Sequence, residues 1–186
     1  MAATLHSYME TKMRICNVVL LAGLSVFAVG YTQAGVVNSA SVPKAADIPV
    51  NATCTSTINE QIGEIIYKGG TSTTNGVEIC GTVTSVTTQP DHGSGPHHIV
   101  HLTAPLPASA AQPGNTYNVE IAVNDNLDGS IDARKGDTVF AYGQAYSDAD
   151  GTVGVHDVHC STGAGIANGW VVVEWPNNKK VYGCTK

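Results

Sequence analysis

Histidines gather in two short stretches of this sequence, and imidazole both binds metal ions and exchanges protons near neutral pH. The chain holds seven His against nine Lys and Arg together. The two stretches consist of His92, His97, His98 and His101, and then of His156 and His159 with Asp157 between them. Imidazole beside a carboxylate suits Zn²⁺ or Cu²⁺, and the same pair could act as a general acid and base.

Strand geometry limits which side chains of the first stretch could act together. Pro96 and the β-branched residues after it predict a strand that begins near residue 97. Four residues of a strand span roughly 13 Å, so His97 and His101 could not share one ion. His97 and His98 point to opposite faces, and the sequence does not decide which of the two faces a site.

In the second stretch, Asp157 and His159 share a strand face at about 7 Å between Cα atoms, close enough to converge on one ion. His156 could join them only through a bulge. The predicted metal site therefore combines His97 or His98 with His159 and with either Asp157 or His156. The alternative is a set of incidental His on polar strand faces.

A second candidate for a metal is the acidic stretch from Asn124 to Asp132, whose oxygen-bearing residues have the spacing of an EF-hand calcium loop. Lys135 stands where such a loop needs a bidentate Glu, and the flanks predict a strand and a turn instead of helices. A solvated acidic loop is therefore the favoured interpretation, with a weak extracellular Ca²⁺ site as the alternative.

Four of the five Cys follow the N-terminal segment and predict two disulfides. They are Cys54, Cys80, Cys160 and Cys184. The sequence leaves all three possible pairings open. A zinc site of four thiolates is disfavoured because no two of these Cys have the C-x-x-C spacing.

The N-terminal segment has the pattern of a secretory signal peptide over residues 1–34. Lys12 and Arg14 precede an uncharged, apolar run, and Ala34 supplies a small residue for cleavage. The apolar run is short and interrupted by glycines, which argues against a membrane span in the mature chain. We therefore expect a secreted protein, extracellular or periplasmic, in agreement with the disulfides. Residues 35–53, rich in Ala, Ser and Val, predict a flexible tether.

The remaining chain, residues 54–186, predicts a single disulfide-stapled β domain. Its one amphipathic helix follows Thr57, with isoleucines at helical spacing and a capping box formed by Thr57 and Glu60. Six or seven short strands follow, with Gly81 as a candidate bulge and a final hairpin around Pro176. This order predicts a mainly β fold, a small OB-like β-barrel, with a β-sandwich as the alternative.

The order of motifs over about residues 77–182 resembles a small exported bacterial domain family of unknown function. In that family, the pattern Gly-Ser-Arg-His-Gln-Arg is followed by Ala-His-Asn-Ile-Asp-Leu, then Ile-His-Trp-Thr-His-His, and then Gly-Gly-Trp. The corresponding segments here begin at Gly93, Ala122, Val155 and Asn168. The resemblance implies an exported fold and carries over His97 or His98, Asn124, His156 and His159, with Asn124 as a ligand-binding residue. Val123 and Cys160 replace two of the family's His residues, so this chain has two fewer candidate ligands than the family pattern.

These observations favour a secreted domain that binds a small ligand or metal ion through a His-lined patch. A metal-assisted hydrolase of the phosphodiesterase or nuclease type is one alternative, with His156 or His159 as base or ligand. A secreted interaction protein with an extracellular partner and incidental His is the other. The net charge of −6 argues against a grip on nucleic-acid backbone, which needs clustered Lys and Arg.

Overall fold

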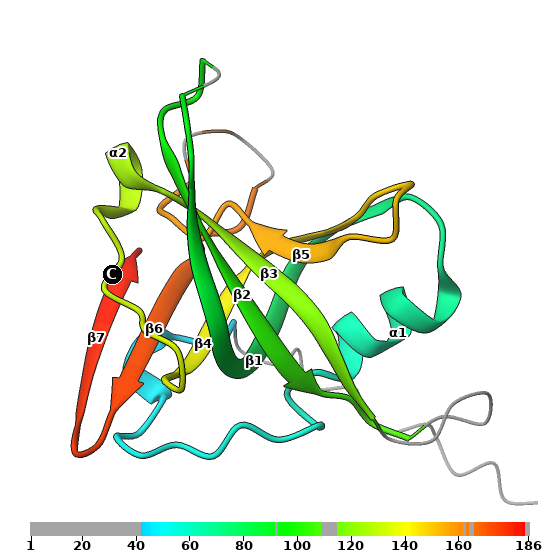
Figure 1. Cartoon of the computed structure of the whole chain (residues 1–186), viewed down its shortest axis with the longest axis horizontal. Coiled ribbons are helices and arrows are strands. Elements are labelled where there is room, and N and C mark those ends of the chain that lie inside the picture. Colours follow the sequence, from blue (N-terminus) through cyan, green and yellow to red (C-terminus); the bar gives the residue numbers. More distant parts are fainter. Residues whose placement is uncertain (1–41, 92, 109–114, 162, 164–165, 185–186) are drawn as a thin grey trace, which may run out of the picture. The chain divides into compact units, whose positions relative to one another are not determined.

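The computed structural model describes residues 42–91, 93–108, 115–161, 163 and 166–184 (Figure 1). The predicted signal peptide, His92 and the first part of the predicted tether lie outside these residues. The described residues belong to one compact unit. No helix among them is both long enough and apolar enough to cross a membrane.

The fold is mainly β, as predicted. Along the chain its elements are η1 (Ala45–Asp47), α1 (Glu60–Lys68), β1 (Ser72–Gln89), β2 (His97–Pro105), β3 (Thr116–Asn124), α2 (Asp125–Asp128), β4 (Thr138–Ser147), β5 (Val153–His156), β6 (Trp170–Trp175) and β7 (Asn178–Gly183). The hairpin expected around Pro176 is present as β6 and β7.

Five of the seven strands form a ring. The strands pair in the order β1-β2-β3-β5-β4-β6-β7, and β1 also pairs with β4, so that β1, β2, β3, β5 and β4 close on one another. β1 can serve two neighbours because it is 18 residues long. Its first part pairs with β4 and its second part with β2. All pairs are antiparallel except β3 and β5, which run parallel.

The irregularities of β1 are not at Gly81, where the sequence predicted a bulge. The register shifts instead between Asn75 and Val77, and again between Val83 and Ser85. Gly81 has a different role, because a Cβ there would lie 2.9 Å from the carbonyl oxygen of Thr103 on β2. Glycine is therefore needed at residue 81 for a close approach of two strands.

Alternating apolar side chains of the ring strands make the main core. Its fully buried members include Val77, Ile79, Val100, Leu102, Ile121, Val123, Val139 and Val155. Ile62 of α1 is also completely buried in this cluster. Burial of each such side chain contributes about 1.5 to 3 kcal/mol, which fixes the register of every strand that carries one.

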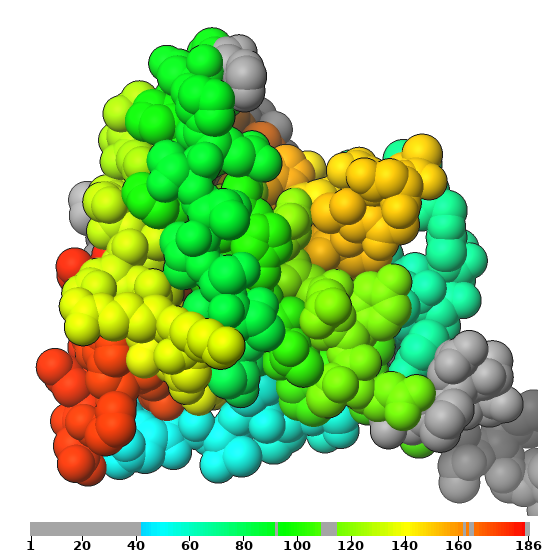
Figure 2. All heavy atoms as spheres, in the orientation of Figure 1, coloured from blue at the N-terminus to red at the C-terminus, as the bar shows by residue number. Residues whose placement is uncertain are grey.

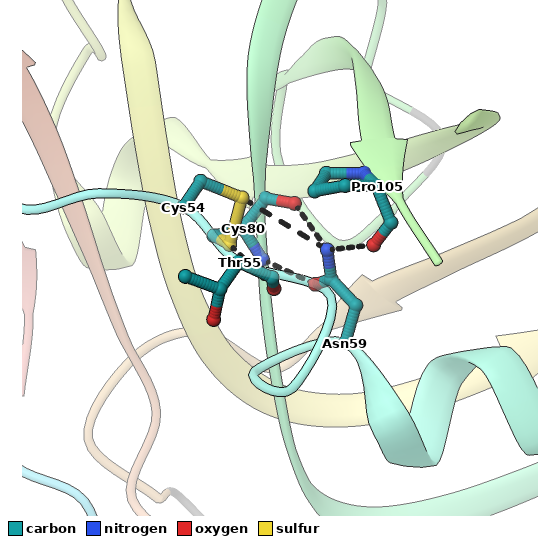
Figure 3. The surroundings of a disulfide bond; sticks show 5 residues. All are labelled: Cys54, Thr55, Asn59, Cys80 and Pro105. Atoms are coloured by element: carbon teal, nitrogen blue, oxygen red, sulfur yellow. Dashed lines mark hydrogen bonds between the residues drawn. A yellow bond between two sulfur atoms is a disulfide. The ribbon is translucent and has the colours of Figure 1, made fainter. Parts of the chain in front are cut away.

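The helix begins differently from the prediction. α1 starts at Glu60 after Asn59, and the side chain of Asn59 makes no capping hydrogen bond to the first turn. Asn59 is fully buried, and its side-chain amide instead bonds the N–H and the carbonyl of Cys80 and the carbonyl of Pro105, at 2.8 to 3.0 Å (Figure 3). Asn59 thus ties the start of α1 to β1 and to the end of β2.

Both predicted disulfides are present. Cys54 is joined to Cys80, and Cys160 to Cys184. The first links the segment before α1 to β1, beside Asn59 (Figure 3). The second links the chain after β5 to the end of β7.

The described part of the predicted tether packs on the domain. Ala45 and Ile48 are buried in a second apolar cluster with Phe140 of β4 and Trp170 of β6. The indole N–H of Trp170 donates to the carbonyl of Pro43 at 2.9 Å. Residues 42–53 therefore cover one side of the sheet, because their apolar side chains are buried against β4 and β6.

Candidate functional site

Strand pairing brings the two His stretches to one edge of the ring. β2 starts where β3 ends, with His97 opposite Asn124. β5 runs parallel to β3 and therefore ends at the same edge, with Val155 beside Ile121. We call this edge the His patch and define it by His97, Asn124, Asp128, His156, Asp157 and His159.

His97 is held by main-chain and amide groups at the start of β2. Its Nδ1 lies 2.8 Å from the carbonyl oxygen of Gly95, and its Nε2 lies 3.4 Å from the side-chain nitrogen of Asn124. Asn124 in turn donates from that nitrogen to the carbonyl of Ser94 at 2.6 Å. With the proton assigned to Nδ1, the lone pair on Nε2 of His97 faces the patch.

Asp128 connects the two His stretches electrostatically. Its Oδ2 accepts a hydrogen bond of 3.0 Å from the backbone N–H of Asn124, whereas its Oδ1 is buried without a partner among the described residues. Burial raises the pKa of this carboxyl, and the hydrogen bond from Asn124, followed by His159 and His97, opposes the rise. The sequence placed Asp128 only in the calcium-like stretch. Asp128 follows Asn124 by four residues, a spacing that brings both into one short helical turn. That spacing is the sequence signal that could have placed Asp128 in the His patch.

The second stretch is a tight turn and not the end of a strand. β5 ends at His156, whereas the sequence predicted a strand through residue 159, because Asp157 has a left-handed backbone with φ of 54°. The Oδ1 atom of Asp157 lies 3.5 Å from Nδ1 of His156 and 3.6 Å from Nε2 of His159. The turn therefore places one carboxylate oxygen between two imidazoles.

His159 is the most enclosed of these imidazoles, with a side chain 11% exposed. Its Nδ1 lies 2.9 Å from the carbonyl oxygen of the next residue, Cys160. With the proton on Nδ1, the Nε2 lone pair faces Asp157 and is available to a ligand.

Three glycines form the floor under this turn. A Cβ on Gly143 would overlap the carbonyl oxygen of His156, one on Gly169 that of Asp157, and one on Gly183 that of Val158. The N–H of Gly169 also donates to the carbonyl of His159 at 2.7 Å. The backbone of the turn thus lies directly on the strands behind it, next to the Cys160–Cys184 disulfide.

The other candidate His residues lie outside this constellation. Nδ1 of His98 lies 2.6 Å from Oδ1 of Asp125, and both side chains are about one-fifth exposed. His101 contacts Glu120 farther along the sheet. Of the two residues that the sequence could not separate, His97 is therefore the one that meets Asn124.

The donor set of the patch matches part of a metal site. Two ligands at about 2.1 Å from Zn²⁺ in tetrahedral geometry lie about 3.4 Å apart, close to the 3.6 Å between Asp157 Oδ1 and His159 Nε2. No group of three or more His, Cys, Asp or Glu side chains within the described part of the chain converges closely enough to hold an ion. In the calcium-like stretch, Asn124 Oδ1 and Asp128 Oδ2 both accept backbone hydrogen bonds of their own turn.

Comparisons with known proteins add no assignment. No protein-family model matches the chain, and no curated protein or solved structure is significantly similar to it. The resemblance to the exported family of unknown function therefore stays a prediction based on the motifs.

Proposed function

We propose that this chain is a secreted, OB-like β-barrel protein that binds a metal ion or a small ligand through the His patch. The strand order β1-β2-β3-β5-β4-β1 supports the OB-like part of the proposal, since a five-stranded ring that closes in this order is the arrangement of that fold. The two disulfides support export, because such bonds persist in oxidising compartments.

The pair Asp157–His159 is the observation that carries the binding proposal. Its two donor atoms lie at the separation of neighbouring ligands on Zn²⁺ or Cu²⁺, and a glycine floor holds the turn in place. The buried, unpartnered Oδ1 of Asp128 adds an oxygen that a bound cation or a donor group of a ligand would satisfy. Water or a movement of His97 or His156 would complete the coordination.

Metal analysis of the untagged protein tests this function. We expect the purified protein to contain stoichiometric Zn²⁺ or Cu²⁺, or to bind one of them stoichiometrically in a calorimetric titration. His159→Ala should bind the metal at least tenfold more weakly. His98→Ala is the matched control, because His98 lies nearby but is paired with Asp125. Equal binding by wild type and His159→Ala, or no binding of either metal, would contradict the metal site.

A further inference from the structure

A second polar constellation lies on the outer face of the sheet, and the contact between the rings of His156 and Tyr146 connects it to the His patch. Thr87 of β1, His101 of β2 and Glu120 of β3 occur on three adjacent strands, and His101 stands directly opposite Glu120 in the register. The Thr87 hydroxyl lies 3.1 Å from Nε2 of His101, and Nδ1 of His101 lies 3.7 Å from Oε2 of Glu120. Hydroxyl, imidazole and carboxylate therefore lie in a row, with a hydrogen bond between Thr87 and His101 and a longer, charge-range contact between His101 and Glu120.

The carboxylate of Glu120 is held in place by a residue of β4. Tyr146 of β4 donates a hydrogen bond from its hydroxyl to Oε1 of Glu120. Burial, followed by this hydrogen bond, raises the pKa of Tyr146, so the phenol remains a donor. Gly154 of β5 makes room for the contact, because a Cβ there would lie 2.7 Å from the Tyr146 hydroxyl and 2.8 Å from Cγ of Glu120.

The imidazole opens onto a groove of about 860 Å³. Its walls include Ser85, Tyr117 and Asp150, together with His101 and Glu120. Figure 2 shows the near face of the molecule, where β1 to β3 in green lie beside the turn between β4 and β5 in gold. A groove of this size can hold a small substrate against His101, and Thr87 lies outside the lining but within 3.1 Å of the same imidazole.

We propose that Thr87, His101 and Glu120 form a hydrolytic site for small carboxylic esters. A hydroxyl within hydrogen-bond reach of an imidazole, which a carboxylate orients in turn, is the arrangement that activates a nucleophile in acyl transfer. With the His101 proton on the nitrogen that faces Glu120, Nε2 is free to accept the proton of Thr87. The proposed reaction does not use the metal proposed for the His patch, although His156 of that patch packs edge-on against Tyr146.

The reaction has two balanced steps. Oγ1 of Thr87 bonds to the ester carbonyl carbon while its proton passes to Nε2 of His101. The tetrahedral species then expels the alkoxide, which takes this proton and leaves as the alcohol. Water attacks the acyl-threonine as His101 accepts its proton, and return of that proton to Oγ1 releases the carboxylic acid and restores Thr87.

Hydrolysis of p-nitrophenyl acetate by the full chain tests the site. We expect the wild-type rate to fall about 100-fold in both Thr87→Val and His101→Gln, and to be largely kept in Thr87→Ser. Thr88→Val and His98→Gln are the controls, since Thr88 is the next residue of β1 and His98 is its partner on β2, outside the proposed site. Glu120 acts as a positioning residue, so Glu120→Gln should lower kcat and leave KM unchanged.

Covalent labelling gives the decisive readout, because any exposed imidazole hydrolyses activated esters slowly. A fluorophosphonate probe followed by peptide mass spectrometry should modify Thr87 in the wild type and fail to do so in His101→Gln. Modification elsewhere, or a rate that is the same in Thr87→Val as in the wild type, would overturn the proposal. Circular dichroism of each variant confirms that the fold is kept.

Discussion

Asp157 shapes the His patch through both its side chain and its backbone. Its carboxylate lies between His156 and His159, and its left-handed backbone ends β5 so that these two imidazoles can flank it. Asp and Asn adopt this backbone region far more readily than β-branched residues do. Substitutions at residue 157 can therefore separate the effect of its carboxylate charge from the effect of its left-handed backbone.

We expect Asp157→Asn to keep the turn and lose the metal ligand. Its free energy of unfolding should stay within about 0.5 kcal/mol of the wild type, while Zn²⁺ affinity falls at least tenfold. Asp157→Val should lose both, with a destabilisation of about 1 to 3 kcal/mol from the unfavourable backbone. Urea denaturation and calorimetric titration measure the two effects. An unstable Asn variant with normal affinity would contradict this separation.

Sequence patterns identify side chains by type, but they do not show which buried polar group a fold will use. Nothing in the sequence indicates that Asn59 joins α1 to the sheet, because Asn before a helix commonly serves as its N-cap. Its actual partners at Cys80 and Pro105 are 21 and 46 residues away in the chain. Asp128 was seen only within a local motif for the same reason, since its proximity to His97 and His159 arises from strand pairing.

At the scale of elements, the alternation of apolar residues predicted the strands well, and the ends of the strands poorly. β5 stops three residues early because a single backbone angle at Asp157 overrides the pattern. Helix α1 was expected from its isoleucine spacing, but its start depends on the buried amide of Asn59 and not on a capping box. Long-range packing decides such boundaries, and a local pattern does not contain it.

The glycine floor under the His patch leads to a prediction for Gly169. We expect Gly169→Ala to displace the turn at Asp157, because a Cβ there overlaps main-chain atoms that have little room to move. The cost should be about 1 to 3 kcal/mol of unfolding free energy, together with weaker metal binding.

Gly163 offers the matched control for this experiment. It lies in the same connection between β5 and β6, but the nearest atom to a Cβ there is Cδ1 of Ile166 at 3.8 Å. Gly163→Ala should therefore change neither stability nor affinity. Equal effects of the two substitutions would show that the floor does not position the turn.

A pH dependence follows from Glu78 on β1. Burial raises the pKa of this carboxyl, so between its unfolded and folded pKa values the native state binds more protons than the unfolded chain. The contribution of Glu78 to stability therefore falls as pH rises through this window. Glu78→Gln removes that loss, and we expect it to be more stable than the wild type at pH 7.

Denaturant titrations at several pH values check this sign. The advantage of Glu78→Gln should shrink as the pH is lowered and disappear near pH 3, where the carboxyl is protonated in both states. Glu64→Gln, a substitution on the exposed side of α1, serves as the control. An advantage of Glu78→Gln that persists unchanged at pH 3 would contradict a charge-based cause.

For the whole molecule, the two disulfides have similar loop lengths but different neighbours. The sequence separations are 26 residues for Cys54–Cys80 and 24 for Cys160–Cys184, so the chain-entropy model gives each about 3.5 kcal/mol of stabilisation. Cys54–Cys80 lies beside Asn59 and helix α1. Cys160–Cys184 lies immediately after His159, and the N–H of Cys184 also bonds the carbonyl of Gly169.

Paired Cys→Ser variants should therefore separate stability from binding. We expect each double variant to lose about 2 to 4 kcal/mol of unfolding free energy, measured by denaturation. Only the Cys160→Ser, Cys184→Ser variant should also lose metal affinity, because the turn that carries Asp157 and His159 is then held by hydrogen bonds alone. Titrations at a temperature where both variants remain folded make the comparison fair. Equal loss of affinity in both would mean that binding follows global stability, and equal retention would mean that the glycine floor alone positions the turn.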